Sequence, residues 1–146
     1  MLVTSKNEKI KNNSITIDKN KETFSVTQWK KLVLSGYTLR GNQNEKLIPI
    51  DNGIKIGKNV KRIKVNASIK ITFGENQGNG GIYISKNGEV PTDIFYSTTK
   101  GWITYNLTNQ IFDVTENDVI SCIVVSEFTS NNAQIDLGYI TAEVIE

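Results

Sequence analysis

One stretch decides the fold: Ile63-Lys64-Val65-Asn66-Ala67-Ser68-Ile69-Lys70-Ile71-Thr72-Phe73. Every odd-numbered residue in it is apolar, and every even-numbered residue is Lys, Asn, Ser or Thr. Side chains of a strand point alternately to the two faces of a sheet, so this alternation predicts one long strand with a buried face and a solvent face. An amphipathic helix needs apolar residues three and four apart, which this stretch lacks. We expect it to be the central strand of an antiparallel β-structure.

Other segments also carry strand signals. Val119–Ser126 is apolar at consecutive positions, which predicts a strand buried on both faces. The apolar phase of the last segment changes between Ile135-Leu137-Tyr139 and Ile140-Ala142-Val144, and we place the β-bulge that this change requires at Gly138. We interpret Trp29–Leu34 as extended chain that ends at Ser35-Gly36.

Turn sequences separate the expected strands. Asp51-Asn52-Gly53 and Lys86-Asn87-Gly88-Glu89 contain the Asn-Gly pair that tight hairpins favour. Residues 74–81 are rich in Gly, but they lack the Gly-Lys-Ser/Thr ending of a P-loop, so we interpret them as a connecting loop. Strands separated by such turns are typical of an antiparallel sandwich or barrel, with no substantial helix.

The charge balance and the scarce residue types exclude several functions. Lys and Arg number 17 against 15 Asp and Glu, a net charge of +2 that argues against nucleic-acid binding. The chain has no His and one Cys, Cys122, which excludes zinc fingers, Ser-His-Asp triads and Cys-His dyads. We therefore expect no enzyme activity, no catalytic residue, no cofactor and no metal. The alternatives are a paired-carboxylate glycosidase and calcium binding by Asp113, Glu116 and Asp118.

The length of 146 residues predicts one domain that buries a core without disulfides or metals. We expect residues 1–21 to be a polar N-terminal lead-in or connector and residues 22–146 to be a single β-sandwich domain. The N-terminus has no apolar core of signal-peptide length, and no apolar run approaches the length of a membrane span. We therefore expect a soluble protein that is made in a bacterial cytoplasm and does not insert into membranes.

Four segments, taken in order, point to a known family. They are Thr23–Leu34, Gly53–Val60, Tyr83–Gly88 and Phe112–Ser121. Over about residues 22–146 the chain resembles the C1q/TNF-like jelly roll, in the version found in tail and baseplate proteins of phages that infect Gram-positive bacteria.

This resemblance implies an all-β, antiparallel jelly-roll sandwich that assembles as a homotrimer. It also implies a non-enzymatic role in the tail of a virion, either in tail assembly or in receptor binding at the host surface. The partners implied are further copies of the chain, other tail proteins, or a glycopolymer of the host cell wall. The alternative function is a carbohydrate-binding module of a bacterial surface or secreted protein.

Aromatic rings beside turns are candidates for ligand binding, because a ring face can stack on the C–H groups of a sugar. The same rings are favoured in strands and in buried cores. Among the available rings, which include Trp29 and Tyr105, we select Tyr83, Tyr96 and Trp102. The lysines of the central strand are expected to form a solvated face, and attraction to anionic cell-wall polymers is the functional alternative. These lysines are Lys61, Lys64 and Lys70.

Overall fold

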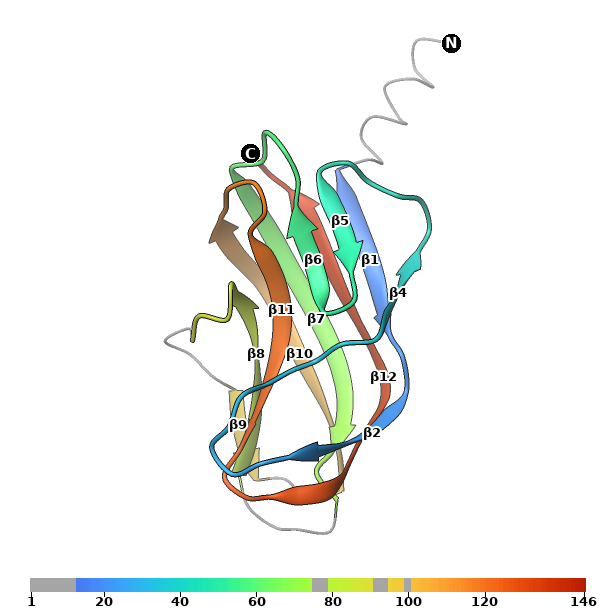
Figure 1. Ribbon diagram of the computed structural model, residues 1–146, viewed down its shortest axis with the longest axis vertical. Coiled ribbons are helices and arrows are strands. Elements are labelled where there is room, and N and C mark those ends of the chain that lie inside the picture. The colour runs from blue at the N-terminus through green and yellow to red at the C-terminus, as the bar shows by residue number, and fades with distance from the viewer. Residues whose placement is uncertain (1–12, 75–78, 91–94, 99–100) are drawn as a thin grey trace.

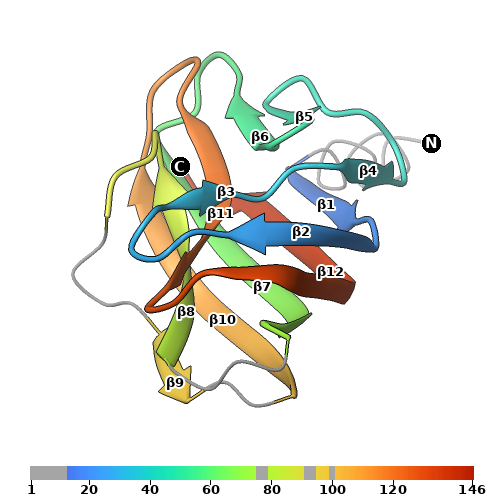
Figure 2. The same ribbon diagram turned by 60° about the horizontal axis from the view of Figure 1, so that its bottom comes forward.

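The computed structural model describes residues 13–74, 79–90, 95–98 and 101–146, which form twelve strands in two antiparallel sheets. The first sheet has the order β10-β7-β12-β1-β4, with β2 also paired to β12; the second has the order β5-β6-β11-β8-β9, with β3 also paired to β11. Figures 1 and 2 show the sheets as the two layers of a sandwich. The first sheet contains β1 (Ser14–Lys19), β2 (Glu22–Val26), β4 (Tyr37–Arg40), β7 (Arg62–Thr72), β10 (Trp102–Asp113) and β12 (Ser130–Val144). The second contains β3 (Leu32–Val33), β5 (Leu47–Ile50), β6 (Gly53–Ile56), β8 (Asn79–Lys86), β9 (Phe95–Thr98) and β11 (Val119–Ser126).

The architecture confirms the predicted fold class, an all-β antiparallel jelly-roll sandwich. The part of the chain that the structure describes contains no helix. It therefore offers no helix with the length and apolar character needed to cross a membrane.

The alternating stretch forms β7, which lies between β10 and β12 in the first sheet, as predicted for a central strand. Its odd-numbered residues face the second sheet: Ile63, Val65, Ile69 and Ile71 are 0% exposed. Its even-numbered residues from Arg62 to Lys70 are half-buried on the opposite face. The 3.3–3.4 Å rise and two-residue period of a strand are enough to produce this division.

The prediction for Val119–Ser126 is also confirmed, because β11 is buried on both faces. Ile120, Cys122 and Val124 belong to the main core between the sheets. Ile123 and Val125 point to the other side, where they form a smaller buried cluster with Tyr83.

Both predicted Asn-Gly turns are present. Asn87 and Gly88 have positive φ angles of 56° and 76° at the end of β8. In the other turn, Ile50 of β5 pairs with Gly53 of β6, so Asp51 and Asn52 between them form the hairpin turn. At Gly53 a Cβ would lie 2.0 Å from the carbonyl oxygen of Ile120, so β11 leaves no room for a side chain.

The β-bulge in β12 lies two residues before the predicted position. Ile135 pairs with Ile71 and Leu137 pairs with Lys70, so Asp136 is the inserted residue. After the bulge Gly138 faces the core, where a Cβ would lie 2.7 Å from Cδ1 of Ile69. A side chain at Gly138 would therefore force Ile69 to move, and the inserted residue of the bulge is the polar Asp136.

Two boundaries differ from the sequence prediction. Ser14–Lys19, expected within a lead-in, forms β1 and pairs with both β12 and β4, so the sandwich begins before residue 22. The segment from Trp29 is not continuously extended: Lys30 N–H donates to the carbonyl of Thr27 (3.0 Å), which closes a turn. At this turn the chain leaves β2 in the first sheet and enters β3 in the second (Figure 2).

Candidate functional site

Exposed apolar side chains gather on the outer face of the first sheet, which is the face turned away from the core. Eight large apolar side chains are exposed in the described part of the chain, and four of them lie on this face. Each of the four is paired with an even-numbered residue of β7, and directly paired residues point to the same side of a sheet. They are Trp102 (48% exposed), Ile111 (50%), Leu137 (61%) and Tyr139 (39%).

The lysines of this face are paired with acids on the neighbouring strand. Lys64 Nζ lies 3.5 Å from Glu143 Oε2, and Lys70 Nζ lies 3.5 Å from Asp136 Oδ2. Lys21 and Lys70 hydrogen-bond to Asp136 and hold the pKa of that carboxyl below its ordinary value. The face is therefore partly exposed, as predicted, but its positive charge is locally balanced.

Arg40 lies at the β1–β4 edge of the same face. Its Nε donates to Asp18 Oδ2 (3.0 Å), and this hydrogen bond holds the pKa of Asp18 below its ordinary value. The guanidinium carbon lies 5.7 Å from the ring centre of Tyr139, which is a cation–π distance. Beside this pair is an open hollow of about 400 Å³, whose lining includes Ser68, Leu137 and Tyr139.

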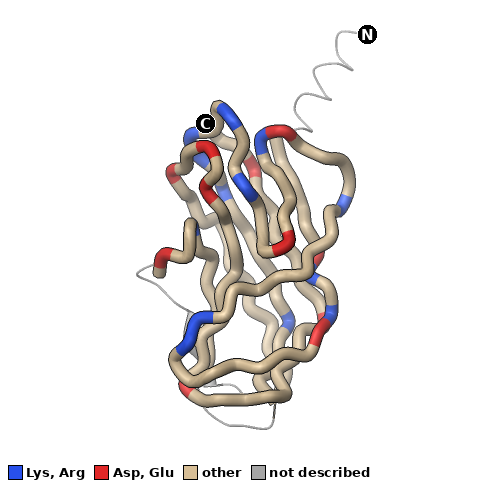
Figure 3. Tube along the Cα trace, in the orientation of Figure 1, with Lys and Arg blue, Asp and Glu red and all other residues tan. Residues whose placement is uncertain are grey.

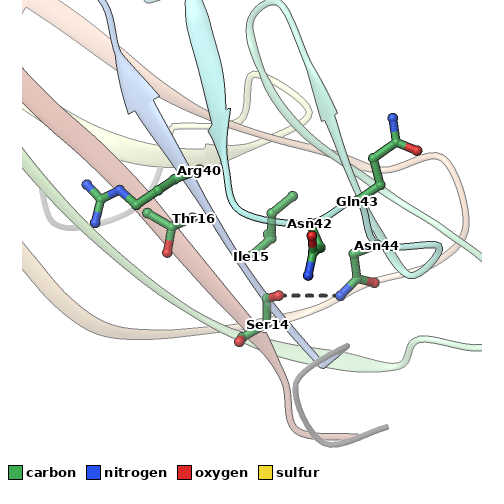
Figure 4. Close-up of a pocket in the computed structure, with 7 residues that line it drawn as sticks. All are labelled: Ser14, Ile15, Thr16, Arg40, Asn42, Gln43 and Asn44. Atoms are coloured by element: carbon green, nitrogen blue, oxygen red, sulfur yellow. Dashed lines mark hydrogen bonds between the residues drawn. The ribbon is translucent and has the colours of Figure 1, made fainter. Parts of the chain in front are cut away.

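Arg40 also contributes to the lining of a second, smaller hollow of about 190 Å³ (Figure 4). Asn44 shapes it: its Oδ1 accepts hydrogen bonds from the backbone N–H groups of residues 46 and 47, and its Nδ2 donates to the carbonyl of Ser14 (3.4 Å). Asn42 and Gln43 are exposed at its rim. The amide groups at this hollow suit a ligand with hydroxyl groups, whereas the guanidinium of Arg40 points away from them and is hydrogen-bonded to Asp18.

The three rings selected from the sequence have different environments. Tyr83 is 1% exposed and packs with Ile123 and Val125, so its ring offers no face to solvent. Tyr96 lies in β9, where its backbone pairs with Gly81; its side chain lies outside the described residues. Trp102 is exposed, but Lys70 Nζ lies 5.6 Å from its ring centre. Tyr83 and Trp102 belong to different sheets, so the structure does not bring them together.

Trp29 is an exposed ring that the sequence analysis considered but did not select. It is 59% exposed and has a φ angle of 60°. A bulky residue rarely occupies this left-handed region, which costs about 1–2 kcal/mol for a residue with a Cβ. Its N–H donates to the carbonyl of Ser126 at the end of β11 (2.8 Å), and this contact holds the turn in place. Strain of this kind is concentrated at functional sites.

Two titratable side chains of the core, Cys122 and Tyr37, stay uncharged at neutral pH, and burial raises the pKa of both. Burial raises the pKa of the Cys122 thiol to about 12, so it is protonated and not a ready nucleophile at neutral pH. Burial also raises the pKa of Tyr37, and the adjacent Cys122 adds to this effect.

The acidic residues considered for calcium have hydrogen-bond partners. Asp113 Oδ1 accepts from Arg62 Nε (3.0 Å), and Asp118 accepts from Asn87 Nδ2 (2.9 Å) and from the N–H of Thr115 (2.9 Å). In the described ranges no group of three or more His, Cys, Asp or Glu side chains is placed to hold a metal ion.

The order of the strands defines the class of fold: the chain has a C1q/TNF-like jelly roll. Solved structures with this fold match nearly its whole length. The vertex protein P5 of PRD1 matches with a TM-score of 0.54 and 14% identity, over 92% of this chain and 98% of that chain. Murine APRIL matches with a TM-score of 0.57 and 7% identity, over 90% and 99%. The globular domain of zebrafish complement 1qA matches with a TM-score of 0.54 and 8% identity, over 92% and 98%.

These likenesses are at the level of the fold. No protein-family model matches the chain, and no curated protein matches its sequence.

Proposed function

We propose that this chain is a non-enzymatic domain of a phage or prophage virion, associated with the tail, that works as a homotrimer in assembly or in attachment to the host surface. The observation that carries the proposal is the outer face of the first sheet, with its four exposed apolar side chains. A phage vertex protein among the structures that share the fold supports a place in a virion.

Self-association gives a physical reason for this face. Burying the exposed part of Leu137, which is 61% of its surface, contributes about 1–2 kcal/mol for each copy. Because Lys64 and Lys70 are paired with acids on the same sheet, two such faces meet without strong charge repulsion. Closed symmetric assembly is the usual way for identical chains to cover such a face.

The test is the mass of the purified chain in solution, measured by light scattering over a range of concentrations. We expect three copies for the wild type and a shift toward one copy for Leu137→Asp. Val33→Asp is the matched control, because Val33 is 40% exposed but lies on β3 of the second sheet. A wild-type chain that stays monomeric at high concentration would remove the trimer from the proposal.

A carbohydrate-binding module is the second candidate, and the hollow lined by Asn42 and Gln43 favours it (Figure 4). Such a module binds neutral sugars through amide and hydroxyl contacts. Titration with neutral oligosaccharides, followed by amide chemical shifts, tests this function. Binding that Asn42→Ala and Gln43→Ala both weaken would favour the module, whereas an absence of neutral-sugar binding would favour the virion role.

A further inference from the structure

The connection between β2 and β3, residues 27–31, presents a large aromatic ring and two lysines together; we call it the Trp29 turn. Trp29 is 59% exposed, and Lys30 and Lys31 follow it directly and are exposed as well. In Figure 3 the two lysines are the blue part of this connection, at the lower left of the molecule. Packing does not account for the ring, because most of its surface faces solvent.

The backbone of the Trp29 turn is held by two hydrogen bonds. Trp29 N–H donates to the carbonyl of Ser126 (2.8 Å), and Gln28 N–H donates to Thr129 Oγ1 (3.1 Å). Both acceptors belong to the β11–β12 end of the sandwich, so the turn is attached to the scaffold. The positive φ angle of Trp29 is therefore imposed by the surrounding structure, and the ring is presented in a defined position. Such pre-organisation lowers the entropy cost of binding.

The charge around Trp29 differs from that around Trp102, the other tryptophan. Trp102 has Lys70 over its ring, and Lys70 is paired with Asp136. No salt bridge among the described residues includes Lys30 or Lys31. Among the described residues, Lys31 Nζ has one hydrogen-bond acceptor, the carbonyl of Gly88 at 3.5 Å. The two ammonium groups at the Trp29 turn therefore remain available to an anion from solution.

We propose that the Trp29 turn binds polyanionic glycans, meaning sugar chains that carry phosphate or carboxylate groups. The indole of Trp29 stacks on the C–H face of a sugar ring, as aromatic rings do with apolar surfaces. Lys30 and Lys31 supply positive point charges for the neighbouring anionic groups. This inference rests on the proposed role in attachment to the host surface. It adds to that role a binding site and a class of ligand.

The experiment uses the full chain carrying Trp102→Phe, so that fluorescence reports on Trp29 alone. The probes are poly(glycerol phosphate), polygalacturonate and neutral dextran, with inorganic phosphate as an ion control. We expect one or both anionic polymers to bind and to shift the emission of Trp29, with weaker binding at higher salt because the charges are screened. Dextran and inorganic phosphate are expected to bind at least tenfold more weakly.

Variants then place the site. In the wild-type background we expect Trp29→Leu, and separately the double change Lys30→Ala with Lys31→Ala, to weaken polymer binding at least tenfold. We expect Trp29→Phe, which keeps an aromatic face, to recover part of the loss. The double change Lys46→Ala with Lys58→Ala removes two exposed lysines that lie outside the Trp29 turn and outside the first sheet. It is the matched control for the lysine pair and is expected to change binding less than twofold. Thermal melting of each variant confirms that it is folded before binding is compared.

The outcomes separate the two proposals. Polymer binding that is unchanged in Trp29→Leu would overturn the site and leave host-surface attachment standing. Equal binding of dextran and the anionic polymers would overturn the ligand chemistry. A wild-type chain that binds none of the polymers would overturn this inference, whereas its mass in solution would still decide whether it assembles as a trimer.

Discussion

Replacing Gly138 with Ala is expected to lower the free energy of unfolding by about 1–3 kcal/mol, the usual cost of overpacking a core. Gly138 pairs with Ile69, and its Cβ would lie 2.7 Å from Ile69 Cδ1, 3.2 Å from the Ser68 carbonyl oxygen and 3.3 Å from Lys19 Cβ. Non-bonded carbon atoms prefer a separation of about 3.5–4.0 Å. The first contact is therefore too short by about 1 Å, and a side chain or strand must move.

A second substitution tests whether Ile69 is the source of this cost. Ile69→Val removes Cδ1, the atom closest to the new methyl group, and alone costs about 0.5–1.5 kcal/mol. In the double variant the clash with Cδ1 is absent. The loss of unfolding free energy in the double variant is therefore expected to be about 1 kcal/mol smaller than the sum of the losses in the two single variants. The relief is partial because the contacts with Ser68 and Lys19 remain.

The assay is urea unfolding of the wild type, both single variants and the double variant, followed by tryptophan fluorescence. All four are compared at one protomer concentration, because self-association stabilises the folded state. Gly88→Ala combined with Ile69→Val is the control pair, since a Cβ at Gly88 has no neighbour within 4 Å, and no coupling is expected. Coupling near zero between Gly138 and Ile69 would refute the register that places the bulge at Asp136.

Three further predictions concern β11 and its turn. Gly53→Ala is expected to cost about 3 kcal/mol or more, because the Cβ meets the Ile120 carbonyl oxygen at 2.0 Å; the melting temperature measures the loss, and a normal melting temperature would contradict this geometry. A hydrogen bond from Asn87 lowers the folded-state pKa of Asp118, so its contribution to stability is present above the unfolded-state pKa and is lost as pH falls through the lower folded-state pKa. Asp118→Asn should therefore flatten the acid side of the stability curve, measured by urea unfolding from neutral to acidic pH; an acid limb as steep as that of the wild type would argue against this role. Cys122 is buried and its pKa is raised to about 12, so it should react with a thiol reagent at pH 8 only after unfolding, and rapid labelling of the native protein would contradict its burial.

Much of the sandwich follows from local patterns. The alternation in β7 and the continuous apolar run of β11 report directly which side chains are buried. The turn at Asn87-Gly88 is equally local, because both residues adopt positive φ angles that Asn and Gly tolerate. Each of these features is determined by residues adjacent in the chain.

The features that shape the candidate sites depend on distant contacts. The change of apolar phase in β12 predicts a bulge but not its position. The pairing of Leu137 with Lys70 places the bulge at Asp136 and leaves Leu137 exposed. The Trp29 turn depends in the same way on the carbonyl of Ser126, almost a hundred residues later in the chain. A strained φ angle at a tryptophan has no sequence signal of its own, because tryptophan is more often a strand residue.

The pairing of β1 with β12 determines where attached segments lie relative to the Trp29 turn. Ser14 pairs with Glu143, so the chain enters the sandwich at the same end at which β12 finishes (Figure 1). The Trp29 turn is hydrogen-bonded to Ser126 at the opposite end of the sandwich. The 15 residues of β12 run from one end to the other, a distance of about 45 Å. In the proposed trimer, chains aligned in parallel would present their Trp29 turns together at that opposite end. If these turns bind a repetitive polymer as proposed, several of them together would bind it with an avidity that one weak site does not reach.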